Sequence, residues 1–142
     1  MDEFLLFNLF FLFFVGGISG WIIDTSYRSI DLKRFAPFGY LQQFAGCVIP
    51  FLPIYGIGLT FVYLIQQLFA EYGVFARVAL YAMTLTLLEL CGEYFVRFTI
   101  KIKLWDYSDN YLNYKGAIDL MHSIFWVLLA LAAELIIQIF MH

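Results

Sequence analysis

The chain has 142 residues, of which 63% are hydrophobic and 13% are charged, and its mean hydropathy is +0.85. Soluble domains are close to half apolar and a quarter charged, so this composition excludes an ordinary soluble domain. The net charge of −3 comes without a run of basic residues that could follow a phosphate backbone, and we expect no nucleic-acid partner. Because one membrane crossing takes roughly 20 apolar residues, about four crossings would fill the chain.

Four apolar segments are predicted as transmembrane helices, at residues 4–27, 51–69, 74–100 and 117–141. Asp2 and Glu3 precede the first segment and have the wrong charge for a secretory signal peptide, so we expect this helix to be retained. Pro50 and Pro53 stand at the start of the second segment, where a missing backbone N–H costs least. The sequence therefore predicts an all-α integral membrane protein, a four-transmembrane-helix bundle in which residues 1–142 form a single domain.

Residues 37–50 are apolar, but the stretch is short and is broken by Gly39, Gly46 and two prolines. Three interpretations are open for it: a re-entrant segment, an interfacial segment, or an early part of the second helix.

Basic residues predict the orientation of the helices. All of them except Arg77 lie near the two longer connections: Arg28, Lys33 and Arg34 after the first helix, and Arg97, Lys101, Lys103 and Lys115 around the connection between the third and fourth. Positive residues favour the cytoplasmic side. We therefore expect a multi-pass protein of the cell (inner) membrane with both longer connections in the cytoplasm and both termini on the non-cytoplasmic side.

Several ionisable residues lie within or at the ends of the apolar segments, where such a group costs several kcal/mol unless it is paired or faces water. They are Asp24, Glu89, Glu93, His122 and Glu134. On the third helix Glu89, Glu93 and Arg97 share one stripe, and Arg97 is placed to pair with Glu93. On the fourth, Asp119, Ser123 and Trp126 share a face, with His122 beside it, and we expect this face to look inward.

With this orientation, side chains from three helices are expected to converge near the cytoplasmic boundary: Asp24, Glu93, Asp119 and His122. Any site that belongs to this chain alone should lie there. For Asp24, Glu93 and Arg97 two interpretations are open, hydrogen bonds that tie helices together or direct contact with a substrate or ion. Glu134 lies nearer the outer end, and it could make a helix contact or line a passage.

No metal or other cofactor is expected, because one histidine and scattered carboxylates make a weak set of metal ligands. A general acid/base role for Glu93 or His122 is chemically open, but no nucleophile or phosphate-binding motif accompanies them. An enzyme is therefore the minority interpretation. Gly16 and Gly20 have the Gly-x-x-x-Gly spacing that lets another helix approach closely.

A series of short motifs follows in order along nearly the whole chain. The motifs are Gly20-Trp21 with Asp24, Phe38-Gly39-Tyr40-Leu41, Phe51-Leu52-Pro53-Ile54-Tyr55-Gly56, Glu89, Trp105-Asp106-Tyr107-Ser108, Asn113, Gly116 and Trp126. In this order they resemble the putative ABC-transporter type IV family of small, multi-helix bacterial inner-membrane proteins. The resemblance implies a membrane component related to transport.

The resemblance also implies which polar and aromatic positions to consider, namely Asp24, Tyr55, Glu89, Trp105, Asp106 and Asn113. This chain departs from the family pattern at Asp24, where a Glu is usual, and in the additional residues 42–49 before Pro53. With the candidates from the helix pattern, the predicted polar cluster or substrate-binding site is Asp24, Tyr55, Glu89, Glu93, Arg97, Trp105, Asp106, Asn113, Asp119 and His122.

The expected function is a permease-like transport component that handles a lipid or an anionic small molecule at this cluster. The sequence has no Gly-x-x-x-x-Gly-Lys-Ser/Thr motif, so an ATPase would be a separate chain. Four helices enclose only a narrow centre, and we therefore expect a homo-oligomer or other membrane subunits, with membrane lipids as further partners. Two alternatives are an intramembrane enzyme acting on a lipid head group and a structural or regulatory partner without a site of its own.

Overall fold

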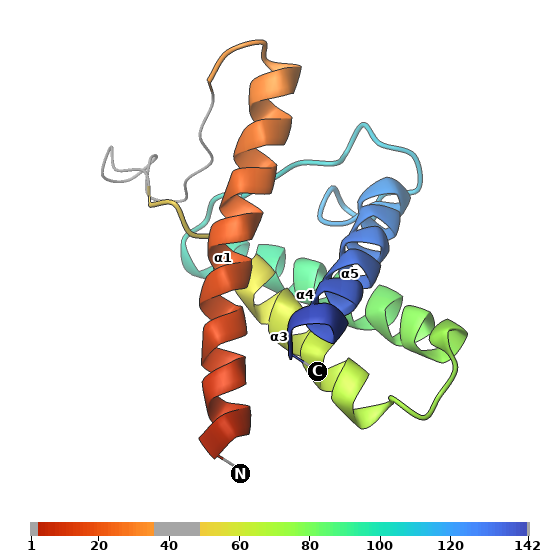
Figure 1. The fold of residues 1–142 in the computed structure, drawn as a ribbon. Helices are drawn as coiled ribbons and strands as arrows, with labels where there is room; N and C mark the ends of the chain where they lie inside the picture. The colour runs from red at the N-terminus through yellow and green to blue at the C-terminus, as the bar shows by residue number, and fades with distance from the viewer. Residues whose placement is uncertain (1–2, 36–48, 142) are drawn as a thin grey trace. The chain divides into compact units, whose positions relative to one another are not determined.

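The computed structural model of the chain describes residues 3–35 and 49–141. Within these residues the chain forms four helices and no strand (Figure 1): α1 (Glu3–Asp31), α3 (Pro53–Leu68), α4 (Val74–Thr99) and α5 (Leu120–Met141). The all-α prediction is confirmed for this part of the chain. The predicted segment 37–50 falls almost entirely outside the described residues.

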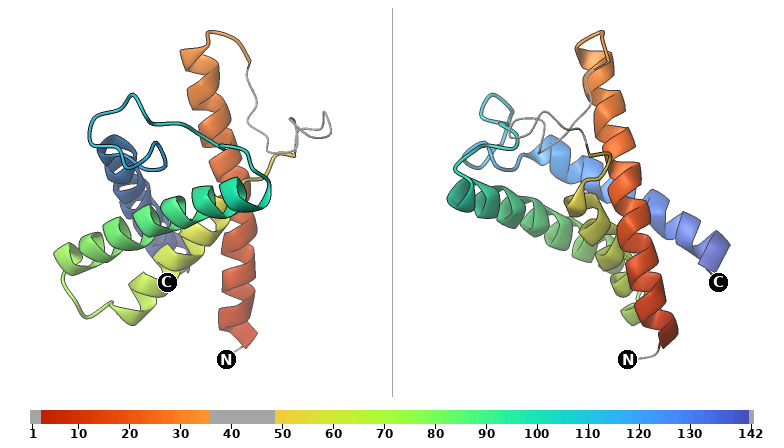
Figure 2. Two further views of the ribbon diagram at one scale, coloured as in Figure 1. Left: turned by 180° about the vertical axis from the view of Figure 1, so that it is seen from behind. Right: turned by 90° about the vertical axis from the view of Figure 1, so that its left-hand side faces the viewer.

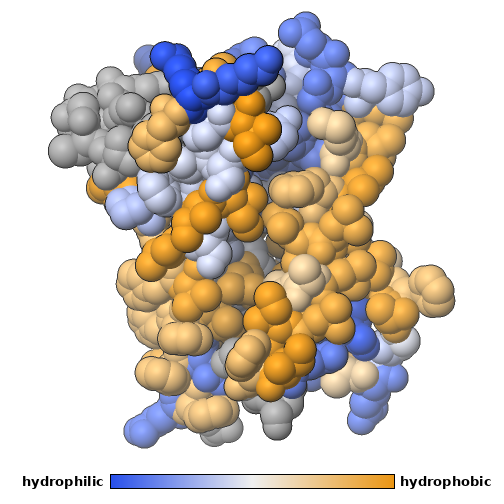
Figure 3. All heavy atoms as spheres, turned by 45° about the horizontal axis from the view of Figure 1, so that its top comes forward, coloured by the Kyte–Doolittle hydropathy of each residue, from blue (hydrophilic) through white to orange (hydrophobic). Residues whose placement is uncertain are grey.

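Three of the helices, α1, α4 and α5, are long and apolar enough to cross a membrane. α3 has 16 residues, fewer than the roughly 20 that a crossing usually takes, because it begins at Pro53 and ends before the turn at residues 69–73. Exposed Phe, Leu and Ile side chains are abundant on the helices, and Figure 3 shows many of them on one face. The chain is therefore a membrane protein, while a fourth crossing by α3 stays a prediction.

Two helix ends differ from the predicted boundaries for reasons visible in the backbone. α1 continues to Asp31 and ends in a Schellman motif: Lys33 has a φ of +50°, its N–H donates to Ile30 O, and the Arg34 N–H donates to Ser29 O. α5 begins at Leu120 rather than near residue 117, because residues 114–118 form a turn that is closed by a hydrogen bond from Tyr114 N to Ile118 O.

Residue contacts divide the chain into two compact units, Met1–Thr60 and Phe61–His142. In the first unit α1 and the start of α3 approach closely at glycines. A methyl group added at Gly20 would lie 2.1 Å from Cγ of Tyr55, and one added at Gly56 would lie 2.4 Å from the backbone oxygen of Phe13. The Gly-x-x-x-Gly spacing on α1 therefore packs helices, as predicted. The single-domain prediction stays a prediction.

In the second unit α4 packs against α5, and both helices bury one stripe of side chains. On α4 the buried stripe is Tyr81, Leu85, Glu89 and Glu93. On α5 it is Trp126, Ala130, Glu134 and Ile137. The connection between the two helices, residues 100–119, has no regular helix and is shown from two sides in Figure 2. This connection carries four residues of the predicted polar cluster, Trp105, Asp106, Asn113 and Asp119.

Candidate functional site

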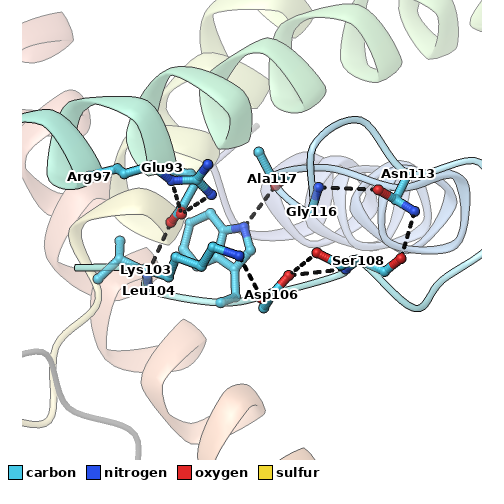
Figure 4. Close-up of polar contacts among 10 residues, drawn as sticks. Glu93, Arg97, Lys103, Leu104, Asp106, Ser108, Asn113, Gly116 and Ala117 are labelled. Atoms are coloured by element: carbon cyan, nitrogen blue, oxygen red, sulfur yellow. Dashed lines mark hydrogen bonds and ion pairs between the residues drawn. The ribbon is translucent and has the colours of Figure 1, made fainter. Parts of the chain in front are cut away.

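The C-terminal part of α4 is fastened to the connection by Glu93, whose side chain is fully buried. Arg97 donates to Glu93 Oε1 from Nη2 at 2.7 Å and from Nε at 3.1 Å, so the ion pair expected from their spacing is confirmed (Figure 4). The other carboxylate oxygen, Oε2, accepts the backbone N–H of Leu104 at 3.1 Å. One carboxylate therefore fixes both the guanidinium and the start of the connection.

The connection folds back on itself, so that residues 105–107 lie beside residues 116–117. The indole Nε1 of Trp105 donates to the Ala117 carbonyl at 2.8 Å, and the Tyr107 N–H donates to the Gly116 carbonyl at 2.9 Å. Gly116 has a φ of +68°, a conformation in which a side chain is strained. These contacts give the connection a defined conformation, in which the Trp105 side chain is held to the backbone just before α5.

Asp106 organises the turn that follows Trp105. Its Oδ2 accepts a hydrogen bond from Lys103 Nζ at 2.6 Å, and its Oδ1 accepts from the Ser108 N–H at 3.1 Å and from the Ser108 hydroxyl. The lysine hydrogen bond, followed by those from Ser108, lowers the pKa of Asp106 to about 2. The carboxylate is therefore ionised at neutral pH, with its charge matched by Lys103.

Asn113 closes the tip of the connection. Its amide nitrogen donates to the carbonyls of Ser108 at 3.0 Å and Asn110 at 2.8 Å, and its Oδ1 accepts the Gly116 N–H at 3.1 Å. These bonds are all made to backbone groups of the connection. Asn113 thus determines the shape of the cluster rather than offering a group to a ligand.

At the start of α5, Asp119 is the N-cap residue and holds His122. Asp119 Oδ1 accepts the His122 N–H at 2.6 Å and lies 2.8 Å from the ring nitrogen Nδ1. The ring of His122 stacks on Tyr107 with 3.9 Å between the centroids, and the Tyr107 hydroxyl donates to Glu89 Oε1 at 3.1 Å. A chain of contacts therefore runs from α5 through the connection to the buried stripe of α4.

Seven of the ten predicted residues contact the connection or belong to it: Glu89, Glu93, Trp105, Asp106, Asn113, Asp119 and His122. Arg97 pairs with Glu93 on α4. The remaining two contact each other in the first unit, where the Tyr55 hydroxyl donates to Asp24 Oδ1 at 2.7 Å. This bond joins α3 to α1, as the helix-tying interpretation of Asp24 expects. The convergence of Asp24 with Glu93 and His122 stays a prediction.

Sequence reasoning assigned no specific contact to Tyr107, which entered only as part of the Trp-Asp-Tyr-Ser motif. Its place in the Trp-Asp-Tyr-Ser motif, beside the candidate Asp106, was the available signal. Lys103 and Asn110 were missed in the same way, although Asn110 donates to Asp119 Oδ2. These partners come from a connection without helical periodicity, so spacing could not predict their contacts.

Glu134 lies in a separate network between α4 and α5. Its Oε1 accepts from Arg77 Nη2 at 2.7 Å and from Gln138 at 3.3 Å, and its Oε2 accepts from the Tyr81 hydroxyl at 2.7 Å. Arg77 also donates to the Tyr72 carbonyl at 2.7 Å. Both oxygens of the buried carboxylate are engaged, so Glu134 makes the helix contact that was one of its two predicted roles.

No group of three or more His, Cys, Asp or Glu side chains is placed to hold a metal ion among the described residues. Cys91 is a free, exposed thiol on α4, and Cys47 lies outside the described residues. The chemistry that the cluster does offer is hydrogen-bond donation by cations. Arg97 Nη1 makes no hydrogen bond within the described chain, and Lys103 Nζ donates to one acceptor.

The sequence matches the family described as putative ABC-transporter type IV over residues 11–142. No curated protein and no solved structure matches the chain.

Proposed function

Because the chain belongs to the putative ABC-transporter type IV family, we propose that it is a permease-like membrane subunit that recognises an anionic group where α4 ends and the 100–119 connection begins. The anionic group is the head group of a lipid or the charged part of a small molecule. The family and the three long apolar helices support a transport-related membrane protein. The cations at the end of α4 are the groups that would bind the anion.

The observation that carries the proposal is the way Glu93 holds Arg97. Nε and Nη2 of the Arg97 guanidinium both donate to one oxygen of the buried Glu93 carboxylate, and the Arg97 side chain is still 28% exposed. Nη1 therefore remains available in a fixed orientation, which suits recognition of a carboxylate or phosphate because little side-chain entropy is lost on binding.

Lys103 adds a second cation to the same place. It precedes Leu104, whose N–H binds the Glu93 carboxylate, so the connection brings the lysine to the end of α4 (Figure 4). Its side chain is 47% exposed and its ammonium group has three hydrogens, of which Asp106 accepts one. The two cations differ in character, since Arg97 is held rigidly and Lys103 can adjust to the ligand.

The energy source is proposed to be a separate ATPase chain, because no nucleotide-binding motif of the Gly-x-x-x-x-Gly-Lys-Ser/Thr type occurs in the sequence. A partner is also needed if the chain is to enclose a polar route, either as further copies or as another membrane subunit.

The test is native mass spectrometry of the protein extracted gently from its own membrane, which reports copy number, co-purifying chains and bound ligands together. We expect an anionic ligand on the wild type, with less retained by Arg97→Lys and by Lys103→Gln. Arg97→Lys keeps a positive charge beside Glu93 but loses the rigidly oriented Nη1 donor. Arg34→Lys, an exposed basic position of the first unit, is the matched control and should retain the ligand. A wild type that carries only neutral lipids and no ATPase would overturn the proposal.

A further inference from the structure

The imidazole of His122 is held by groups that anion recognition at Arg97 does not use. Asp119 fixes one edge of the ring, with Oδ1 at 2.8 Å and Oδ2 at 2.9 Å from Nδ1. The side chain of Asp119 is fully buried, and it also accepts a hydrogen bond from Asn110. A buried carboxylate with several donors around it is a firm anchor for the ring.

The hydrogen-bond pattern determines which tautomer the ring adopts. Burial raises the pKa of Asp119, but the hydrogen bonds from the His122 N–H and from Asn110 outweigh burial, and the net effect is a lowered pKa. The ionised carboxylate can only accept hydrogen bonds, so Nδ1 of His122 must carry a hydrogen. In a neutral ring Nε2 is then the acceptor.

Two other elements surround the ring. Tyr107 of the connection covers one face, with an angle of 15° between the two rings. Behind it, the Tyr107 hydroxyl binds Glu89 of α4, which is buried. The titratable groups around the imidazole are thus Asp119 at the start of α5, Tyr107 in the connection and, through the Tyr107 hydroxyl, Glu89 on α4.

The opposite edge of the ring is open. None of the described residues donates to or accepts from Nε2, and the side chain is 24% exposed. We propose that Nε2 of His122 is a proton-accepting site, with Asp119 as its positioning residue, and that its ligand is a proton delivered by water or by the hydroxyl of a bound molecule.

The donor O–H bond breaks, an N–H bond forms at Nε2, and the donor keeps the electron pair as hydroxide, water or an alkoxide, according to whether water, hydronium or an alcohol supplies the proton. The imidazole becomes a cation beside the Asp119 carboxylate, and the reverse step releases the proton. Proton acceptance at His122 does not depend on anion recognition at Arg97, so a test of one does not decide the other.

The experiment is nitrogen NMR of labelled histidine in detergent micelles. The chain has two histidines, so His142→Gln leaves His122 as the only signal. We expect a neutral ring with hydrogen on Nδ1 alone and an Nε2 signal typical of a nitrogen without hydrogen, as a proton acceptor requires. A ring that carries its hydrogen on Nε2 would overturn the proposal.

Two variants in the His142→Gln background separate positioning from packing. Asp119→Asn keeps the helix cap, because Asn is an equally good N-cap residue, but it should lose the single Nδ1–H tautomer. Tyr107→Phe keeps the ring stacking and removes the bond to Glu89, so its tautomer should match the wild type. An Asp119→Asn spectrum with the wild-type tautomer would contradict the positioning role.

Discussion

At Gly116 the connection turns back toward Trp105, and a methyl group there would lie 2.5 Å from both Asp106 Oδ1 and Ser108 Oγ. We expect Gly116→Ala to lower the free energy of unfolding by at least about 1 kcal/mol, because the left-handed backbone and the crowding act together. The thermal midpoint in detergent measures this. Lys115→Ala is the control, since Lys115 is exposed and has a φ of +53° but already carries a Cβ atom. Equal midpoints for the two variants would show that Gly116 is not needed for the turn.

The contribution of Asp106 to stability depends on pH. Its pKa is lowered from 3.8 to about 2, so the stability it contributes is fully present above pH 3.8 and is lost as the pH falls through about 2. We expect the Ser108 amide resonance, which reports the bond to Asp106, to titrate near pH 2 in the wild type. In Lys103→Gln the midpoint should move up toward 3.8. A wild-type midpoint near 3.8 would contradict the lysine contact.

Residues on regular helices could be predicted from the sequence better than residues of the connection. The Glu93–Arg97 pair follows from a spacing of four residues and the cost of an unpaired charge in an apolar helix. The contacts of Tyr107 and Asn110 depend on how the connection folds back, which no periodic pattern encodes. The family resemblance indicated Trp105, Asp106 and Asn113. It did not predict that the Asn113 side chain makes its hydrogen bonds with backbone groups.

At the scale of the helices, the Arg77–Glu134 pair joins α4 to α5 with 2.7 Å between Arg77 Nη2 and Glu134 Oε1. We expect Glu134→Leu to lower the free energy of unfolding by about 3–5 kcal/mol, because it leaves a nearly buried guanidinium without its carboxylate. The double variant Arg77→Met/Glu134→Leu should recover most of this loss, since it removes both charges. Unfolding by a denaturing detergent gives the comparison, with Gln138→Leu as the control for the weaker 3.3 Å contact. A double variant as unstable as Glu134→Leu alone would contradict this account.

The sequence analysis set Arg77 apart only as the basic residue away from the two longer connections. α4 begins at Val74, so Arg77 lies in its first turn and Tyr81 follows one turn later on the same face. The spacing of Arg77 and Tyr81 could be read from the sequence. Their partner on α5 could not, because a contact between two helices depends on how the helices pack. The end of α1 could not be predicted either, because Lys33 occupies the left-handed position of the Schellman motif that Gly usually fills.

At the scale of the whole molecule, the distribution of basic residues predicts that both termini lie on the non-cytoplasmic side. We expect alkaline phosphatase fused after His142 to be active and a fluorescent protein fused there to be dark. Fusions within the connection, after Tyr111, should give the opposite result. A fluorescent C-terminal fusion would reverse the orientation and put the connection out of reach of a cytoplasmic ATPase.

The start of α3 has a consequence for how the chain enters a membrane. The Leu52 N–H donates to the Gly17 carbonyl at 2.9 Å, so α3 begins beside the middle of α1 and not beyond its end. Sixteen residues of helix measure about 24 Å, less than the roughly 30 Å hydrocarbon thickness. The Leu52 N–H, just before α3, would meet acyl chains without its Gly17 acceptor if α3 inserted alone. Biogenesis should therefore insert α1 first, so that its Gly17 carbonyl is in place to accept the Leu52 N–H.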